Sequence, residues 1–439
     1  MAKRNPYPDA KKLLDFIDQS PSPWHATANM ADQLRAAGYQ PLDESTAWSL
    51  EPGSGYFVIR DESSLIAFQT GTAPPSASGF SLLGAHTDSP GLRVKPNPTT
   101  ESKKLIRIGV EVYGGPILAT FADRDLGLAG RLVYRDQDQL ATRLVRFPTP
   151  IMRIPSLAIH MDRQVNEQGL KFDKQTQIPP LLGAASDELP AQQQFRQLLA
   201  DQSQLDPDQI VSWELNLFDA QPGSFYGPAG EFIANGQLDN LASCHAAMTA
   251  LLAQSGPGEQ TRVCGFFDHE EVGSTSSKGA AGSFLADTLQ RICATLESDP
   301  SAAKQALARS FLISGDMAHA WNPAFASSYD DAHAVQVNGG PVIKINANQR
   351  YSTEALSEAI FADLCATAKV PVQRYVHRTD LPCGSTIGPI TAAALGVRSI
   401  DVGNPMWSMH SARESAGAAD HGMMIKVMNQ FLSQKLPAV

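Results

Sequence analysis

The C-terminal half of the chain alternates short apolar runs with longer segments whose apolar residues recur every three or four positions. The short runs predict buried strands and the longer segments predict amphipathic helices. We expect helices over 240–252, 279–296, 354–368 and 421–432, and strands over 263–267, 311–314, 342–346 and 397–402. Because alternating strands and helices form parallel sheets with helical cover, the pattern predicts an α/β fold with a mixed, mostly parallel sheet flanked by helices.

The N-terminal part continues this pattern, but the middle of the chain breaks it. Helical spacing, a hairpin pattern and an apolar run follow one another at 10–19, 24–37, 55–60, 64–70 and 80–85. Alternating strand patterns then appear at 106–113, 131–134 and 142–147, and no βα rhythm is visible from 148 to 228. We therefore expect a catalytic domain made of 1–95 and 231–439, interrupted by an inserted β-rich domain at 96–230.

Two adjacent carboxylates, Glu270 and Glu271, follow the apolar run 263–267. An isolated Glu-Glu pair is most often a solvated loop, but this pair is not isolated. Other residues that can bind a metal also lie just after a strand-like run or just before a helix-like one: His86, Asp239, Asp316 and His410. Ligands bind at that edge of open α/β sheets, so we expect these side chains to meet there.

A site made of two imidazoles and three carboxylates can hold two zinc ions with three ligands each, if the ions share one carboxylate. These five residues are His86, His410, Asp239, Glu271 and Asp316. Asp239 is the best candidate for the shared ligand, because it stands at an expected helix start, where the helix dipole favours a carboxylate. Two zinc ions would acidify a water and polarise a carbonyl, and Glu270 would take the proton. Asp88 is placed to fix the orientation of His86. Co²⁺ or Mn²⁺ are possible substitutes, because such sites discriminate weakly among these ions.

Composition excludes several other classes of protein. The 439 residues carry a net charge of −10 without a basic cluster, which leaves nucleic acid no surface to bind. No apolar run approaches the roughly 20 residues that cross a bilayer, and 1–6 lacks the apolar core of a signal peptide, so we expect no membrane partner and a cytoplasmic location. The five cysteines are odd in number and far apart, which favours free thiols over disulfides.

The motifs around these residues closely resemble the aspartyl aminopeptidase family of dinuclear zinc exopeptidases, nearly from end to end. The matching segments include His86-Thr87-Asp88-Ser89-Pro90, Asp239-Asn240, Glu270-Glu271-Val272-Gly273-Ser274, Asp316-Met317-Ala318-His319, Met409-His410-Ser411, Asp123-Arg124-Asp125-Leu126-Gly127 and Ile154-Pro155-Ser156-Leu157-Ala158-Ile159-His160. One departure is Phe121-Ala122, near a position where the family often has tryptophan.

The resemblance implies a division of the ligands between the two ions. It makes His86, Asp239 and Asp316 ligands of one zinc, and Asp239, Glu271 and His410 ligands of the other, with Glu270 as the base. It also implies a zinc-exopeptidase catalytic domain, an inserted dimerisation domain, and a homo-oligomer, usually a dodecamer built from dimers.

Family members prefer peptides with an acidic N-terminal residue, which requires a cation in the substrate pocket. Lys344 is the candidate, with Arg350 and Tyr351 in support. Without the resemblance, a lysine on a strand is ordinarily a solvated edge residue. His160 could be a further zinc ligand or could reach a neighbouring subunit's active site. We favour the second role, because the other ligands already supply three per ion.

Other functions stay open at the level of the sequence. A dizinc carboxypeptidase or an N-acyl amino-acid deacylase would need the same metals, because only recognition of a free α-amino group separates them from an aminopeptidase. A non-catalytic assembly protein could also keep the fold. The intact Glu270 argues against that last function, because a binding module needs no base beside its metal.

Overall fold

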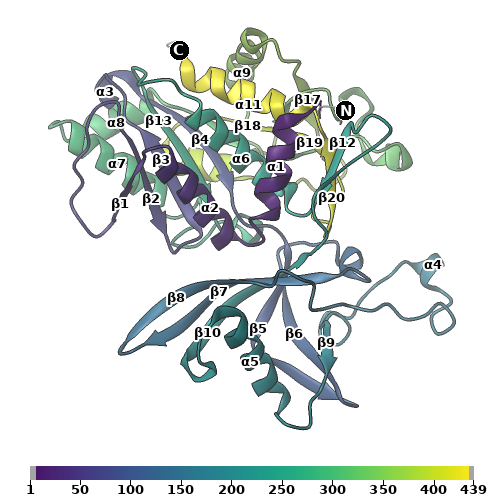
Figure 1. Cartoon of the computed structure of the whole chain (residues 1–439). Coiled ribbons are helices and arrows are strands. Elements are labelled where there is room, and N and C mark those ends of the chain that lie inside the picture. Colours follow the sequence, from purple (N-terminus) through teal and green to yellow (C-terminus); the bar gives the residue numbers. More distant parts are fainter. Residues whose placement is uncertain (1–5, 435–439) are drawn as a thin grey trace, which may run out of the picture.

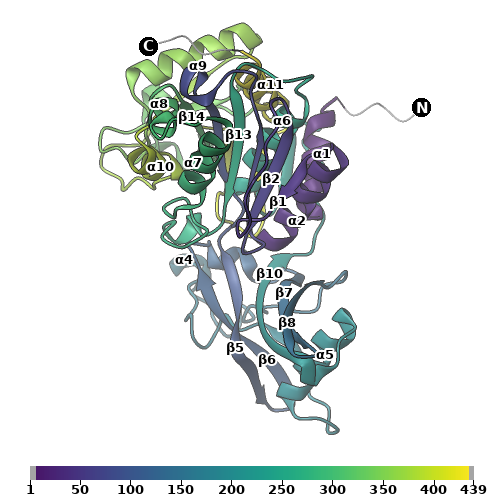
Figure 2. The same cartoon turned by 90° about the vertical axis from the view of Figure 1, so that its left-hand side faces the viewer.

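The computed structural model describes residues 6–434, and within them nine strands form one sheet (Figures 1 and 2). Its order is β1-β2-β3-β13-β4-β14-β18-β16-β17. The four central strands, β13, β4, β14 and β18, run parallel to one another. On either side of them, β3 pairs antiparallel with β13, and β16 pairs antiparallel with β18. The bounds are β1 Gln40–Leu42, β2 Gly55–Arg60, β3 Ser64–Gln69, β13 Thr261–Phe267, β4 Phe80–His86, β14 Phe311–Gly315, β18 Arg398–Gly403, β16 Val342–Ile345 and β17 Gln373–Val376.

Helices cover both faces of this sheet, which explains why its central strands are continuous apolar runs. Successive side chains of a strand point to opposite faces. In β4, Leu83 and Ala85 pack with α1 Pro8–Asp18, α2 Pro23–Ala36, α6 Leu238–Leu252, α9 Ala355–Ala368 and α11 Asp420–Ser433. Phe80 and Leu82 pack on the other face with α7 Phe284–Leu296, α8 Ala302–Ala308 and α10 Ile387–Leu395. The predicted α/β fold with a mixed, mostly parallel sheet is confirmed.

A second sheet of the same body joins segments that are far apart in the sequence. Its order is β11-β12-β20-β19-β15, with bounds β11 Ser224–Tyr226, β12 Phe232–Asn235, β20 Glu414–Gly417, β19 Pro405–Trp407 and β15 Ala318–His319. The antiparallel β12–β20 pair sets Asn235 opposite Glu414. This pairing brings the chain just after His410 beside the chain just before Asp239.

The inserted segment forms a separate lobe with its own core (Figure 1). Among the described residues its antiparallel sheet has the order β8-β7-β10-β5-β6-β9, and α5 Ala191–Ser203 packs against it. The bounds are β8 Gln139–Arg146, β7 Leu126–Asp136, β10 Ile210–Asp219, β5 Gly91–Ser102, β6 Leu105–Tyr113 and β9 Leu181–Ala184. The chain enters this sheet at Gly91 and leaves it at Asp219, which is 5 residues before the expected limit of 96 and 11 residues before that of 230. A role in dimerisation stays a prediction.

Several predicted elements differ in detail from those observed. The expected helix 279–296 begins at Phe284, because 279–283 forms turns after the glutamate pair. Neither α5 nor β10 was anticipated in the segment 148–228. The expected absence of a signal peptide rests partly on residues 1–5, which lie outside the described residues. Residues 435–439, at the end of the expected catalytic domain, also lie outside them. Within 6–434, no helix is long and apolar enough to span a membrane.

Candidate active site

Three neighbouring parallel strands deliver most of the candidate residues to one edge of the large sheet. Strand β4 ends at His86 and lies between β13 and β14. Phe267, the last residue of β13, is opposite His86, and the chain then turns into the short helix Glu270–Val272. Asp316 follows β14 directly. Because the carboxyl ends of parallel strands meet at one edge, residues far apart in sequence become neighbours here.

Asp239 and His410 come from outside these strand ends. Asp239 stands in the first turn of α6, and His410 lies in the loop between β19 and β20. The β12–β20 pairing holds the two segments together, so that both side chains face the strand ends.

The first group of side chains joins His86, Asp239 and Asp316. His86 Nε2 lies 3.5 Å from Asp239 Oδ1 and 3.5 Å from Asp316 Oδ1. Burial alone would lower the pKa of His86, but the carboxylates of Asp239, Asp316 and Asp88 outweigh it and raise that pKa well above its usual range.

The second group joins Asp239, Glu271 and His410. His410 Nε2 lies 3.5 Å from Asp239 Oδ2 and 3.4 Å from Glu271 Oε2. Here too the carboxylates overcome the effect of burial and raise the pKa of His410 to about 11. Asp239 therefore offers one oxygen to each group.

These distances fit a shared metal better than hydrogen bonds. They exceed the upper end of ordinary N–H···O bonds, about 3.2 Å. Two ligand atoms on one tetrahedral zinc, each about 2.1 Å from the ion, lie about 3.4 Å apart. Asp239 Oδ1 is buried and has no hydrogen-bond partner among residues 6–434. A buried carboxylate oxygen without a partner is costly, and a bound cation would remove that cost. The donor set therefore fits zinc.

Glu270 lies beside the first group, farther from His86 than the two aspartates are. Its Oε2 is 4.0 Å from His86 Nε2, farther than the oxygens of Asp239 and Asp316. Burial, with Asp316, Glu271 and Asp88 nearby, raises the pKa of Glu270 to about 9. Burial likewise raises the pKa of Glu271 to about 7. Glu270 and Glu271 also form a third group of potential metal ligands with His86.

Asp88 organises the residues around it from a fully buried position. Its carboxylate accepts from the backbone N–H groups of Glu270 and Glu271, both at 3.1 Å, and from the hydroxyl of Tyr113 at 2.6 Å. His86 Nδ1 lies 3.0 Å from the backbone carbonyl oxygen of Asp88 and 3.4 Å from its Oδ1. Asp88 therefore fixes the glutamate turn as well as the imidazole.

Sequence reasoning missed Glu414, which supports the second group as Asp88 supports the first. Its carboxylate accepts from the backbone N–H of His410 at 2.7 Å and from that of Asp239 at 3.1 Å. Burial and the neighbouring Asp239 raise its pKa well above the usual range. A glutamate four residues after His410, at the start of a strand, was the available signal.

The inserted lobe also contacts the second group. His410 Nδ1 lies 3.1 Å from the carbonyl oxygen of Gly115, and the backbone N–H of Ile117 donates to the carbonyl of His410 at 2.9 Å. Thr120 Oγ1 accepts from the N–H of Ala412 at 2.9 Å. The loop after β6 therefore sets the orientation of one imidazole.

Lys344 lies in β16, an interior strand of the sheet, and is 2% exposed, so it is not a solvated edge residue. Its Nζ lies 3.0 Å from Asp316 Oδ2 and donates to the carbonyl of Met317 at 3.1 Å. The Tyr351 ring is 5.0 Å from the ammonium. Arg350 is exposed, and its Nε donates to the carbonyl of Cys383.

Three further histidines, His160, His319 and His269, lie outside these groups of potential metal ligands. His160 is exposed on a loop of the inserted lobe, and within 6–434 it belongs to no group of potential metal ligands. His319 packs beside Tyr375 and His377, and burial lowers its pKa to about 4. His269 Nδ1 lies 3.0 Å from Ser276 Oγ.

Comparison with known proteins identifies the family. Residues 16–432 match the family described as aminopeptidase I zinc metalloprotease (M18). The chain belongs to the M18 family. A probable M18 family aminopeptidase 2 of Stutzerimonas stutzeri (strain A1501) is 47% identical over 426 residues, 96% of this chain and 97% of that protein. One from Pseudomonas aeruginosa (strain UCBPP-PA14) is 47% identical over 435 residues, 97% and 98% of the two chains.

Solved structures agree with this assignment. The cryo-EM structure of the Ape4 and Nbr1 complex contains a chain that is 39% identical, with a TM-score of 0.94 over 97% of this chain and 85% of that one. An M18 aminopeptidase from Thermotoga maritima shares the fold at 22% identity, with a TM-score of 0.86 over 97% and 96%. The predicted resemblance is confirmed, and this M18 member is a zinc-dependent aminopeptidase, a hydrolase.

Proposed function

We propose that this aminopeptidase removes acidic residues from the N-termini of peptides, using two zinc ions per subunit. The observation that carries the proposal is the sharing of Asp239, whose two oxygens each face a different histidine. His86, Asp239 and Asp316 would hold one ion, and Asp239, Glu271 and His410 the other. When bound, the two ions polarise the peptide carbonyl and lower the pKa of water.

Glu270 moves the proton. Bound zinc ions would lower the raised pKa of Glu270, because nearby positive charge favours the ionised carboxylate. At the rim of the first group, this carboxylate would then accept a proton from the attacking water and later deliver it to the leaving amine nitrogen. Asp88 supports this step by holding the N–H groups of Glu270 and Glu271, so that the two adjacent carboxylates keep separate directions.

The variant Glu270→Gln tests this assignment, because it keeps the shape of the side chain but cannot accept the proton. We expect zinc content near that of the wild type and a loss of most turnover of aspartyl arylamide. Asp363→Asn, on the exposed face of α9, is the matched control. Turnover that survives in Glu270→Gln would refute the role of Glu270.

The preference for acidic residues rests on Lys344. An ammonium has three donors. Two of those of Lys344 are directed to Asp316 and to the Met317 carbonyl, which leaves one for a substrate carboxylate. Tyr351 packs against this cation, and Arg350, in the loop after β16, is a second positive charge.

A change of selectivity tests this pocket better than a loss of rate, because Lys344 also contacts the metal ligand Asp316. We expect Lys344→Met to lower the ratio of kcat/KM for aspartyl over alanyl arylamide by about tenfold or more, since one buried charge-assisted hydrogen bond is lost. Arg350→Gln serves as a comparison and should change the ratio less. An unchanged ratio in Lys344→Met would exclude Lys344 as the specificity residue.

Dialysis against a chelator, followed by metal add-back, tests the metals. We expect activity to disappear and to return with Zn²⁺, with two ions bound per subunit, and Co²⁺ or Mn²⁺ to replace zinc at least partly. The assay uses a panel of aminoacyl arylamides with free and blocked amino groups. Hydrolysis of blocked substrates alone would favour the N-acyl amino-acid deacylase, and release of C-terminal residues would favour the carboxypeptidase.

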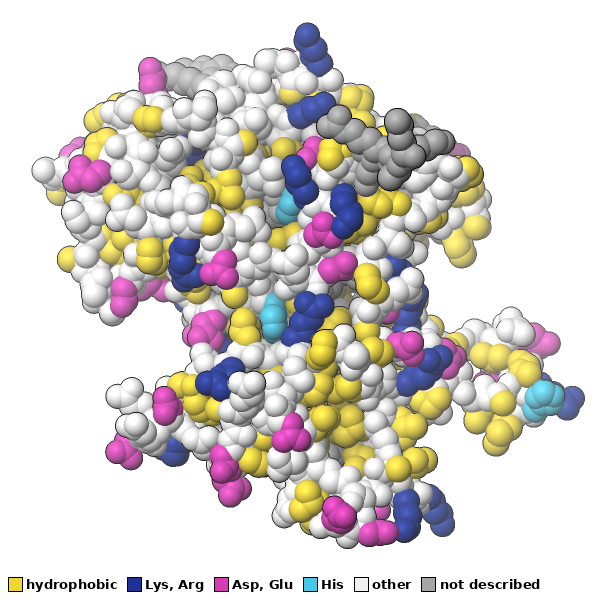
Figure 3. Space-filling model, in the orientation of Figure 1, with side chains coloured by type: hydrophobic (Ala, Val, Ile, Leu, Met, Phe, Trp, Pro, Cys, Tyr) yellow, Lys and Arg dark blue, Asp and Glu magenta, His cyan; other side chains and the backbone are white. Residues whose placement is uncertain are grey.

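We also propose that the protein acts in the cytoplasm as a closed homo-oligomer built from dimers. A solved yeast relative, 27% identical with a TM-score of 0.84, is described as the mApe1 dodecamer. In this protein, the part of the inserted lobe that carries α4, Val165–Gln168, also contains His160. The apolar side chains of Leu157, Ile159 and Met161 are exposed on either side of that histidine. Hydrophobic side chains are visible on this lobe (Figure 3). Apolar side chains this exposed favour a protein partner, and a second copy would place His160 at another subunit's site.

Mixing two inactive variants tests this arrangement. We expect His160→Ala and Glu270→Gln each to be poorly active, and co-assembly of the two to restore part of the activity, because some active sites then combine an intact Glu270 with a neighbour's intact His160. Analytical ultracentrifugation establishes the size of each assembly. A full-sized assembly without any restored activity would refute action across the interface.

A further inference from the structure

The first two strands of the inserted lobe return the chain to the active site. Strand β5 begins at Gly91, shortly after Asp88, and Tyr113 ends β6 directly opposite Gly91. Residues that face each other in an antiparallel pair lie about 5 Å apart. The β5–β6 pair therefore places Tyr113, a residue of the inserted lobe, beside the segment that follows His86.

The hydroxyl of Tyr113 binds the carboxylate that holds the glutamate turn. It donates to Oδ2 of Asp88 at 2.6 Å, a distance typical of a hydrogen bond from a hydroxyl to an ionised carboxylate. The same Oδ2 accepts from the N–H of Glu271 at 3.1 Å, and Oδ1 accepts from that of Glu270 at 3.1 Å. Tyr113 therefore makes the shortest of these three hydrogen bonds to Asp88.

The ring of Tyr113 is also held from two sides. The guanidinium carbon of Arg93 lies 3.8 Å from the ring centroid, which is a cation–π contact. The ring of His269, the residue before Glu270, has its centroid 6.3 Å away. Burial and the carboxylate of Asp88 raise the pKa of Tyr113, so the hydroxyl keeps its proton and remains a donor.

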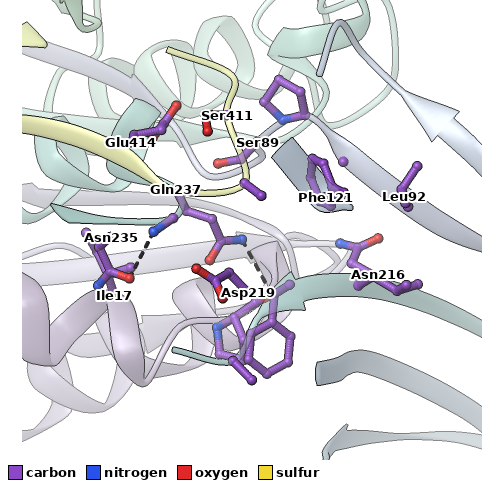
Figure 4. A pocket seen from close by; sticks show the side chains of 18 of the residues that line it. Ile17, Ser89, Leu92, Phe121, Asn216, Asp219, Asn235, Gln237, Ser411 and Glu414 are labelled. Atoms are coloured by element: carbon purple, nitrogen blue, oxygen red, sulfur yellow. Dashed lines mark hydrogen bonds between the residues drawn. The ribbon is translucent and has the colours of Figure 1, made fainter. Parts of the chain in front are cut away.

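Packing alone does not fix this side chain, because Tyr113 lines a cavity of about 120 Å³ between the inserted lobe and the catalytic body. Figure 4 shows this cavity, with Leu92 of the inserted lobe on one side and Ser411 and Glu414 on the other. A side chain beside an open space has fewer packing contacts than one in a filled core. The hydrogen bond to Asp88 therefore matters more for its position.

The two residues after Tyr113 contact the metal ligands themselves. Gly114 has a φ of +67°, and a Cβ there would lie 3.1 Å from the carbonyl oxygen of Glu271 and 3.2 Å from its Cβ. Glycine permits both this backbone conformation and this close approach. The carbonyl oxygen of Gly115 lies 3.1 Å from Nδ1 of His410. Residues 113–115 thus form a wall of the active site that comes from the inserted lobe.

We propose that Tyr113 is a positioning residue, which holds the turn of Glu270 and Glu271 through Asp88 and so couples the inserted lobe to turnover. This role depends on the proposed function of Glu270 as the base. A base transfers a proton well only within hydrogen-bond reach of its partner, so a small displacement of the turn slows that step. The metal ligands and Lys344 are unchanged when the hydroxyl is removed, so metal content and KM should change little.

Tyr113→Phe tests the proposal, because it removes the hydroxyl and keeps the ring. We expect kcat for aspartyl arylamide to fall by about tenfold or more, KM to stay within about twofold, and zinc content to stay near that of the wild type. Tyr134→Phe is the matched control in the same lobe, because its hydroxyl contacts Arg143 instead, and it should follow the wild type. A wild-type kcat in Tyr113→Phe, or a loss of zinc that accounts for the lost turnover, would overturn the proposal.

Thermal unfolding of the zinc-free protein shows whether Tyr113 acts through Asp88. We expect Tyr113→Phe to lower the Tm by about 2 °C or more, because a buried carboxylate loses a donor. In the Asp88→Asn background the same substitution should lower the Tm less, because the charged acceptor is gone. Equal losses of Tm in the two backgrounds would overturn the route through Asp88.

Glu270→Gln, measured in the same series, separates this role from the proposed mechanism. If Glu270→Gln loses turnover and Tyr113→Phe keeps it, only the positioning role of Tyr113 fails. If Glu270→Gln keeps its turnover, the base role of Glu270 fails, and the positioning role of Tyr113 fails with it.

Discussion

Two histidine clusters, both involving α6, differ in almost every electrostatic respect. Near its start, Asp239 faces His86 and His410, and carboxylates raise the pKa of both imidazoles. Six residues further along the helix, His245 Nδ1 lies 2.8 Å from Nε2 of His421 on α11. Among residues 6–434, no hydrogen bond or ion pair joins a carboxylate to this second pair. Burial lowers the pKa of His245 to about 4, against the opposing charge of nearby Asp9, and lowers that of His421 far below its usual range.

The difference shows what makes a buried histidine functional. A histidine among carboxylates keeps charge and can exchange its proton for a metal ion, whereas a buried histidine whose hydrogen-bond partner is another histidine stays neutral. The pair on α6 and α11 therefore holds two helices together, and the cluster at the sheet edge holds a site. The predictions below test this contrast, beginning with the largest expected effect on activity.

Substitution of the shared aspartate should cause the largest loss. In Asp239→Ala, both histidines lose their common carboxylate, so we expect zinc content to fall for both ions and kcat/KM to drop by about 10³-fold or more, equivalent to about 4 kcal/mol of barrier. Metal analysis and arylamide hydrolysis measure the two effects. Normal zinc content in this variant would contradict a shared ligand.

His86 and His410 should differ in what their loss does to the fold. The His86 side chain is 1% exposed and that of His410 is 30% exposed. We expect His86→Gln to lower the free energy of unfolding by about 3–5 kcal/mol, because buried carboxylates lose their partner. His410→Gln should reduce activity strongly with a smaller loss of stability. Urea denaturation of both variants in their zinc-free form compares the two free energies of unfolding directly. Equal losses of stability would contradict the expected difference between His86 and His410.

Glu414→Gln should produce an intermediate effect. A glutamine oxygen can still accept from one of the two N–H groups, those of His410 and Asp239, but the glutamine NH2 group cannot accept from the other. Outer partners of metal ligands typically contribute 10–100-fold, so we expect activity to fall by about that factor. Titration of zinc into the chelated variant should show that one of the two ions binds more weakly, whereas two unchanged affinities would exclude this role.

The sequence predicted the site at the edge of the large sheet better than it predicted the supports of that site. Strand ends carry their own signal, an apolar run that stops at a polar residue, which located His86, Glu271 and Asp316. Glu414, Tyr113 and Gly115 act through contacts between segments that are far apart in the chain, and no local pattern marks such contacts. Lys344 was found as a cation on an apolar strand, but its pairing with Asp316 required the order of the strands in the sheet.

The smallest effect on activity is expected at the second cluster, where pH should act on stability instead. An unfolded histidine binds a proton below about pH 6.5, whereas folded His245 stays neutral down to about pH 4. The unfolded chain therefore binds more protons between these values, so this pair makes stability fall as the pH falls from about 6.5 to 4. For His245 the loss at pH 4 is of the order of 3 kcal/mol.

His245→Asn removes this titration and keeps a polar partner for His421. We expect arylamide hydrolysis at pH 7 to be unchanged, and the fall in urea midpoint between pH 7 and pH 5 to be smaller than in the wild type. His333→Asn, on a partly exposed surface turn, is the matched control and should follow the wild type. If His245→Asn loses stability on acidification as steeply as the wild type, the neutral pair is not what limits folding at low pH, and the contrast between the two clusters does not hold.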